Sequence, residues 1–485
     1  MNDFDPEKIP DDFLFFAWEN LSPRDRAKVL SGSPRTAWVF GAGASHHYNL
    51  NSRAVPMPLA NGFFEAFHKL PTSEGFHAFV GPLIAYLAHS RGIMARDAIH
   101  WTENIEDFMT SVESELSQMR EMRRRLQEDQ IDMMKQFSAV GVFNNMSFIC
   151  ANVINEAQNG PSYSVYRYLL DFCGPDDSFI TFNWDTLLDR ALADSGGWTP
   201  NNGYGISFAS VLDGTWKNSV ESSPVFHTGW KLLKLHGSTN WLVPYTSVQP
   251  DSLDYQSSVP QSSDVFLFWQ STLPYETYKG RWRGGYAPTC YCFYPPNIPV
   301  ETFTDEQLSS GPDRVFISFS YRGIFCPFSE PDGAGIPSSP LIVTPVREKR
   351  YDIYESKMES IWSQSADCIA QADRIIIIGY SFPPTDIRPL ELLRDSLAKR
   401  GGDISVQIVG PDAQSIAARI GDGCLANAKS IDLHSIKFEE YLEILADEAP
   451  KMLKRAATQF SDVKDWLERI YFFHERSDDF YRTNR

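Results

Sequence analysis

The chain has 485 residues, of which 42% are hydrophobic and 22% charged, so it is long enough for two to four structural units with a substantial core. This composition excludes collagen, a coiled-coil rod and an extended disordered chain. The 44 basic and 62 acidic residues leave a net charge of −18, which disfavours binding to nucleic-acid phosphates. We therefore expect no nucleic-acid partner.

Signals for export, membrane insertion and metal binding are weak. The first residues are acidic where a secretory signal is basic, and no apolar run approaches the roughly 18–20 residues of a membrane-spanning helix. The seven cysteines include no Cys-x-x-Cys pair, which argues against a disulfide framework and a zinc ribbon. A metal site at Cys290, Cys292 and Cys326 would need a fourth ligand that the sequence does not show. We expect a cytoplasmic protein with reduced thiols, no bound metal and no membrane contact.

The first third of the chain is predicted to be mostly helical. Residues 1–33 predict a short helical lead-in that is interrupted by prolines. Residues 36–40 then predict a buried strand, which runs directly into the glycine-rich turn 41–45. Helical periodicity from 61 to 172 indicates a large helical insertion, whose cluster of arginines is surrounded by acidic residues and is typical of a solvated helix face.

Strand patterns return in the middle of the chain. Residues 178–182 and 232–235 predict two further buried strands. Residues 244–340 are rich in Ser, Pro, Gly and aromatic residues, which predicts a loop-rich insertion with a few short strands. The regular pattern resumes at 341–345.

The last third alternates strands with helices. Residues 374–378 and 404–409 are nearly continuous β-branched runs, and a predicted helix follows the first of them. Such runs separated by helices are typical of a parallel sheet covered on both faces. We predict an α/β fold with a Rossmann-like, doubly wound, mostly parallel sheet as one domain over 34–449, followed by a helical tail over 450–485.

Polar motifs follow the predicted strands directly, at 41–45, 183–185, 236–238, 379–381 and 410–412. In a parallel α/β sheet, ligands bind beyond the carboxyl ends of the strands. A glycine-rich turn that enters a helix offers backbone N–H groups to a pyrophosphate. The pair at 41 and 43 lacks the third glycine of the usual dinucleotide fingerprint, so it also fits a tight strand-to-helix turn.

Taken in order, these motifs resemble the sirtuin-like superfamily. The matching pieces are Gly-Ala-Gly-x-Ser at 41–45, Thr-x-Asn-x-Asp at 181–185, His-Gly at 236–237 and Gly-x-Ser at 379–381. The resemblance spans roughly residues 36–445. The segments around the last two motifs are closer to the bacterial defence-associated branch, whose members hydrolyse NAD, often to starve an infected cell.

The chain departs from the sirtuin deacylases in three places. It has no zinc module with two Cys-x-x-Cys pairs, no Gly-Ile-Pro-Asp-Phe-Arg cofactor loop and no Val-x-Phe-Gly-Glu segment along a peptide substrate. Residues 54–58 occupy the neighbourhood of the cofactor loop. These departures argue against protein deacylation and leave the expected cofactor site in place.

The resemblance implies NAD as the substrate and gives the matching residues their roles. His236 suits a base, since an unperturbed imidazole has a pKa of about 6.5, and Asn183 can bind ribose hydroxyls or position water. The cofactor-binding residues would be Gly41, Ala42, Gly43, Ser45, Asp185, Gly379 and Ser381. Several of these residues also have a structural interpretation. Asn183 fits a helix cap, Ser381 and Asp386 fit caps or turn formers, and His236 fits a structural hydrogen bond. His46 and His47, next to the glycine-rich turn, are interpreted as helix-surface residues.

These observations lead to one main hypothesis and two alternatives. The main hypothesis is an NAD glycohydrolase that releases nicotinamide and ADP-ribose in bacterial anti-phage defence by NAD depletion. Such an activity would need restraint by oligomerisation, a regulatory protein partner or a bound signal, with the two insertions as control surfaces. The alternatives are an NAD-dependent protein deacylase or ADP-ribosyltransferase, and a catalytically silent module that binds NAD or ADP-ribose in a larger complex.

Overall fold

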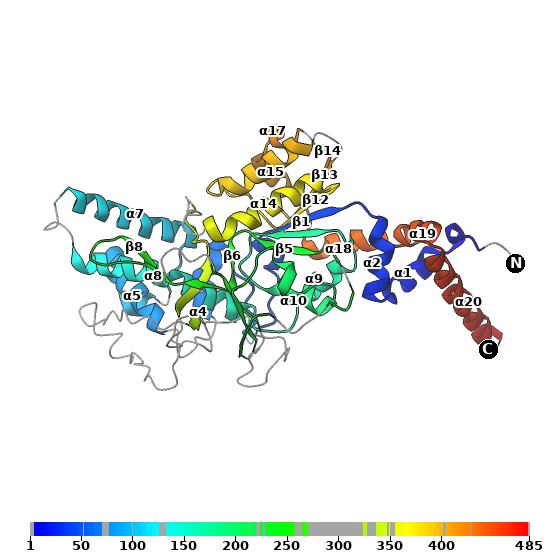
Figure 1. Ribbon diagram of the computed structural model, residues 1–485, viewed down its shortest axis with the longest axis horizontal. Coiled ribbons are helices and arrows are strands. Elements are labelled where there is room, and N and C mark those ends of the chain that lie inside the picture. The colour runs from blue at the N-terminus through cyan, green and yellow to red at the C-terminus, as the bar shows by residue number, and fades with distance from the viewer. Residues whose placement is uncertain are drawn as a thin grey trace.

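A six-stranded parallel sheet forms the centre of the protein (Figure 1). The computed structural model describes residues 4–483 except 52, 70–76, 99, 126–131, 214, 220–223, 227, 258–263, 270–323, 327–335, 347–348, 350–354, 401–403 and 427. The strands of the central sheet are β1 (Thr36–Phe40), β2 (Ser178–Thr181), β5 (Lys231–Lys234), β12 (Arg374–Ile378), β13 (Ile404–Val409) and β14 (Ala428–His434).

The strand order is β14-β13-β12-β1-β2-β5, and all neighbouring pairs are parallel. Numbered by position in the chain, the order is 3-2-1-4-5-6, which is that of the Rossmann fold. The order reverses between β1 and β12, where Phe40 and Ile378 lie side by side at the ends of their strands. The predicted Rossmann-like, parallel α/β fold is therefore confirmed, and the reversal marks the position where such sheets bind ligands.

Helices cover both faces of this sheet, as its apolar strands require. β1 and β12 bury nearly all of their side chains, because neither strand has a face toward solvent. α9 (Ser164–Leu170) and α10 (Leu187–Ser195) pack together on one side, and α14 (Glu355–Gln371) and α15 (Ile387–Arg400) on the other (Figure 1). The remaining helices of the core are α3 (Ala42–Ser45), α11 (Pro200–Gly203), α16 (Ala413–Ile420), α17 (Asp422–Leu425) and α18 (Phe438–Asp447).

The edge strand β14 was not predicted from the sequence. Among the described strands it pairs only with β13, and its apolar residues Ile431 and Leu433 remain 42% and 41% exposed. Polar residues alternate with them, so the segment lacks the continuous apolar run that identifies a central strand.

A second six-stranded sheet contains the segment where the regular pattern was expected to resume. Its order is β10-β11-β6-β9-β3-β4, and β11 (Ile336–Ile342) pairs antiparallel with β6 (Gly237–Pro244). The regular pattern expected to resume at 341–345 thus begins with a strand of the second sheet, to which Leu341 and Ile342 belong, because an apolar run alone does not select its partner strand. The other strands are β3 (Ser210–Asp213), β4 (Thr215–Lys217), β9 (Phe266–Phe268) and β10 (Ile324–Cys326).

The helices between β1 and β2, in the region predicted as a helical insertion, pack around one long apolar helix, α8 (Met133–Ala157), which contacts α5 (His77–Arg91) and α7 (Ile105–Arg124). By length and composition α8 could span a membrane, contrary to the expectation from the sequence, but 72% of its most apolar window is buried inside the protein, as in a core helix. A hairpin of β7 (Thr246–Val248) and β8 (Tyr255–Ser257) packs against it. The short helices of the insertion are η3 (Ala60–Gly62), α4 (Phe63–Lys69) and α6 (Ala95–Ala98).

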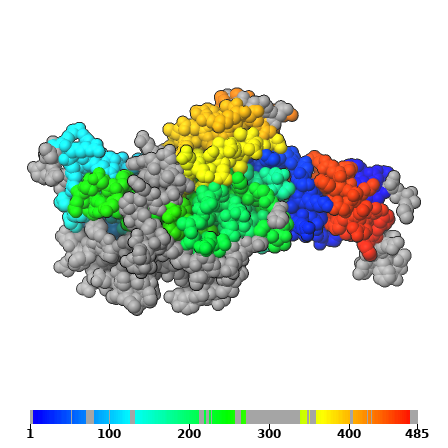
Figure 2. Space-filling view, viewed as in Figure 1, coloured from blue at the N-terminus to red at the C-terminus, as the bar shows by residue number. Residues whose placement is uncertain are grey.

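The two ends of the chain pack against each other. α1 (Asp11–Glu19) contacts α19 (Ala449–Gln459) and α20 (Ser461–Thr483), and Figure 2 shows the blue N-terminal and red C-terminal residues side by side at one end of the molecule. Phe13 meets Tyr471 edge-on with ring centroids 5.0 Å apart. The predicted lead-in and tail thus pack as one helical unit, with η1 (Pro6–Lys8), α2 (Pro23–Val29) and η2 (Leu30–Gly32) as its remaining elements.

Candidate functional site

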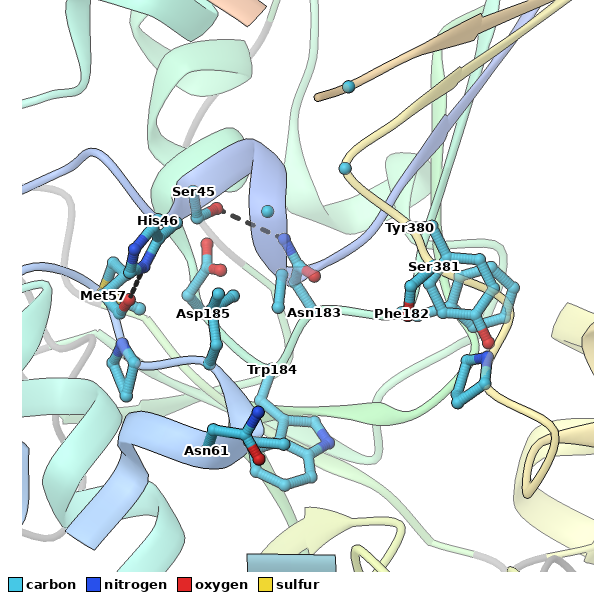
Figure 3. A pocket seen from close by; sticks show the side chains of 18 of the residues that line it. Ser45, His46, Met57, Asn61, Phe182, Asn183, Trp184, Asp185, Tyr380 and Ser381 are labelled. Carbon is cyan, nitrogen blue, oxygen red and sulfur yellow. Dashed lines mark hydrogen bonds between the residues drawn. The ribbon is translucent and has the colours of Figure 1, made fainter. Parts of the chain in front are cut away.

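A cavity of ≈ 610 Å³ lies at the carboxyl edge of the central sheet, where the strand order reverses. Its wall contains residues that follow β1, β2, β5, β12 and β13. Figure 3 shows those that follow β1, β2 and β12, among them Ser45, Asn183 and Ser381. The structure therefore brings the separate sequence motifs to one cavity. The predicted site residues in its lining are Ala42, Gly43, Ser45, Asn183, Asp185, His236, Gly379 and Ser381.

The glycines at this edge allow two strand ends to touch. A Cβ atom on Gly41 would lie 2.5 Å from the Tyr380 Cα, and one on Gly43 would lie 2.9 Å from the Gly379 Cα. The Gly43 N–H donates to the Gly379 carbonyl at 2.9 Å, and the Ala44 N–H donates to Gly41. Two of the amide groups expected to hold a diphosphate thus already have partners in the protein, so tight packing accounts for part of the glycine pattern.

Replacing Gly379 by alanine is expected to lower the free energy of unfolding by about 2 kcal/mol. Gly379 has φ +64°, and its Cβ would lie 2.2 Å from the Ala44 backbone nitrogen. Denaturant unfolding would measure the loss. Gly423→Ala is the matched control, because nothing lies within 4 Å of a Cβ there. Equal stability of the two variants would contradict this account of the turn.

Asn183 is buried at the centre of the wall, with 7% of its surface exposed. Its Nδ2 donates to the Gly41 carbonyl at 3.0 Å and to the Ser45 Oγ at 3.2 Å (Figure 3). Among the described residues its Oδ1 has no hydrogen-bond partner. Asn183 does not cap α10, which begins after Thr186. The amide is held by one end and offers a buried acceptor at the other, which suits a hydroxyl or water of a ligand.

Asp185 lines the cavity together with Asn183 and contacts the buried ion pair of Lys234 and Asp189. Its Oδ1 accepts the Leu187 N–H at 3.0 Å, so this carboxylate supports the start of α10 in addition to lining the cavity. Burial raises the pKa of Asp185, and the positive charge of Lys234 opposes that rise. Lys234 donates to the Asp185 carbonyl and lies 3.1 Å from the Asp189 Oδ2. The position of Asp185 therefore depends on a charged pair beneath the site.

His236 stands against an aromatic wall. Its ring meets Phe182 edge-on with centroids 5.0 Å apart, and Phe182 stacks on Tyr380 at 4.0 Å. The His236 Nε2 lies 3.0 Å from the Asp386 Oδ2. The imidazole is thus held between the Phe182 ring and the Asp386 carboxylate. From the sequence, Asp386 was interpreted only as a cap or turn former.

Several residues that line the cavity were not predicted from the sequence to belong to the site. His46 and His47 were interpreted as helix-surface residues, yet both line the cavity, and His46 Nδ1 lies 2.7 Å from the Met57 carbonyl. Their position next to the glycine turn was the signal that could have found them. Trp184 follows Asn183 directly, and its side chain lines the same cavity as Asn61. Residues from other elements carried no signal, as with Asn61, Asn104, Glu106 and Lys349.

Metal chemistry has no support in the described residues, where no group of three or more His, Cys, Asp or Glu side chains is placed to hold an ion. Cys290 and Cys292 lie outside the described residues. What the cavity does offer is a neutral amide acceptor, an imidazole and buried carboxylates along one wall. This set can orient a polar ligand and accept a proton from it.

Comparison of the sequence with models of known protein families gives no match. Comparison with curated protein sequences gives no significant match.

Proposed function

We propose that the protein is an NAD glycohydrolase, which cleaves NAD to nicotinamide and ADP-ribose. The observation that supports this most directly is that Gly43, Asn183, His236 and Ser381, which come from four separate motifs, line one cavity at the reversal point of a Rossmann-like sheet. Open α/β sheets bind nucleotides at this position. The order of the motifs along the chain resembles the sirtuin-like superfamily, and this resemblance favours NAD as the nucleotide that is bound.

The reaction breaks the bond between the ribose C1′ and the nicotinamide nitrogen, and the electron pair of that bond neutralises the positive charge of the nicotinamide ring. A water oxygen then bonds to C1′, and its proton passes to a base. Because the leaving group departs neutral, the site needs orientation, stabilisation of the oxocarbenium-like centre and a base more than it needs an acid.

The cavity residues can be assigned to these tasks. The Asn183 Oδ1, which no described residue contacts by a hydrogen bond, would accept a ribose hydroxyl or position the water, and His236 would be the base. Asp185 would bind the nicotinamide carboxamide. The turn after β1 would hold the diphosphate, and Gly379 and Ser381 the adenosine ribose.

An unrestrained NAD hydrolase would poison its own cell, so the proposal includes regulation. We place the protein in the cytoplasm of a bacterium, where it would deplete NAD during phage infection, restrained by self-association, a protein partner or a bound signal. Asn61 and Glu106, from the helical insertion, line the same cavity as Asn183. A conformational change in the insertion would therefore reach the substrate directly.

Incubation of the purified full-length chain with NAD tests the proposal, with chromatography of nicotinamide and ADP-ribose as the measurement. We expect equimolar release of both products, and at least a hundredfold loss of rate in His236→Ala. His100→Ala is the matched control, because His100 is exposed and outside the cavity. Binding of NAD without cleavage would instead identify a binding module, and nicotinamide release only with an acylated peptide would identify a deacylase.

A further inference from the structure

A buried network of charged and polar groups connects His236 to the helical insertion. Three groups converge on one oxygen, the Oδ2 of Asp386: the His236 Nε2 at 3.0 Å, the Tyr380 hydroxyl at 2.8 Å and the Lys349 Nζ at 3.3 Å. The Lys349 Nζ also lies 3.4 Å from the Glu106 Oε1 at the start of α7. Asp386 is 2% exposed, so these contacts form away from bulk solvent.

The loop that presents Asp386 is held in an unusual backbone conformation. Gly379 has φ +64° and Phe382 has φ +46°, a left-handed conformation that is uncommon for a bulky residue. The Phe382 side chain is buried and meets the ring of Tyr380 at 4.6 Å. Residues in such conformations persist where the surrounding structure holds them, and they concentrate at functional sites.

We propose that Asp386 is the positioning residue for His236, and that Lys349, itself held by Glu106, sets the charge balance of this pair. An ionised carboxylate only accepts hydrogen bonds, so the His236 Nε2 carries the proton in the contact with Asp386. The neutral ring then has Nδ1 as its basic nitrogen. Asp386 thereby selects the tautomer, fixes the ring plane and stabilises the imidazolium that forms when the base takes a proton.

The charge chain gives each member a definite effect on the imidazole. The negative charge of Asp386 favours protonated His236, whereas the positive charge of Lys349 opposes protonation. Glu106 acts on the imidazole through Lys349, because it holds that ammonium group from the opposite side. The other titratable side chains in the cavity lining are Asp185, His46, His47, Asp412, Tyr380 and Lys437.

Titration of His236 by NMR, on protein with ¹³C-labelled histidine, tests the proposal without any need for catalysis. The His236 signal is identified as the one absent from His236→Gln. In Asp386→Asn, which keeps the side-chain volume, we expect the titration midpoint to fall by about one pH unit. In Lys349→Gln we expect it to rise. Asp395→Asn is the control, because Asp395 is exposed on α15 and paired with Arg394; its midpoint should equal that of the wild type.

The kinetic readout depends on the proposed NAD cleavage and adds a second criterion. Asp386→Asn should lower kcat roughly tenfold and leave KM for NAD nearly unchanged. Because the base must be neutral to act, the acid limb of its pH–rate profile should move to lower pH. Unchanged midpoints in both variants would overturn the positioning role even if NAD is cleaved. Shifted midpoints in a protein that never cleaves NAD would instead retain the positioning role and overturn the proposed function.

Discussion

Replacement of Asn183 by alanine is expected to slow NAD cleavage by about a hundredfold or more, with little change in the free energy of unfolding. The variant loses two hydrogen bonds, to the Gly41 carbonyl and the Ser45 Oγ. It also removes the buried Oδ1, which has no partner among the described residues and therefore destabilises the folded state. These two effects on stability oppose each other, whereas the loss of the ligand acceptor has no compensation.

Steady-state nicotinamide release and denaturant unfolding, measured on the same preparation, would separate the two effects. Asn144→Ala provides a matched control with the opposite outcome. Both amide atoms of Asn144 bond to the Val248 backbone, at 2.9 and 2.7 Å, and the residue is outside the cavity lining. This control should lose stability and keep its turnover rate. If Asn183→Ala instead lowers the free energy of unfolding and leaves the turnover rate normal, Asn183 is a structural residue.

Replacement of Lys234 by methionine is expected to lower the free energy of unfolding by about 3–5 kcal/mol. The side chains of Lys234 and Asp189 are 1% and 0% exposed, and they form a buried ion pair at 3.1 Å. Methionine would fill most of the volume but leave the Asp189 charge without its counterion. The Asp185 carbonyl would also lose its donor, so we expect weaker NAD binding in addition to the lower stability.

Denaturant unfolding of single and double variants would establish the cause of this loss. Adding Asp189→Asn to Lys234→Met should recover part of the stability, because the unpaired charge is removed. Lys451→Met is the control, since Lys451 and Glu448 form an ion pair with side chains 68% and 48% exposed, and such pairs contribute less than about 1 kcal/mol. A double variant no more stable than Lys234→Met would show that lost packing, rather than lost charge pairing, is the cause.

Local sequence patterns were sufficient for most of the central sheet. The strands predicted at 36–40, 178–182, 232–235, 374–378 and 404–409 are present within a residue or two. The clearest of them, β1 and β12, are buried on both faces and are therefore apolar along nearly their whole length. β14 and the second sheet were not recognisable from the sequence. In the edge strand β14, apolar residues alternate with polar ones, and in the second sheet the sequence of one strand alone does not specify its antiparallel partner.

The residues of the candidate site also divide into those that the sequence could predict and those that it could not. Residues that directly follow a strand were identifiable, since parallel strands end at one edge and bring their next residues together, as happens for Asn183 and His236. Glu106 and Lys349 had no such signal. Lys349, from the segment after β11, contacts Asp386, and Glu106, from α7, contacts Lys349. Only the folded chain places these two segments next to the cavity.

The sequence by itself determined the parallel α/β core and the polar residues at its carboxyl edge. Short apolar runs identify buried strands, and the residues that follow parallel strands meet at one edge of the sheet. Only the tertiary structure decided what those residues contact: that the glycines allow two turns to pack closely, that Asn183 has a buried acceptor with no partner in the described part of the chain, and that Asp386 contacts His236. Such contacts join segments far apart in the chain, and their geometry follows from the packing of the whole fold rather than from any single segment.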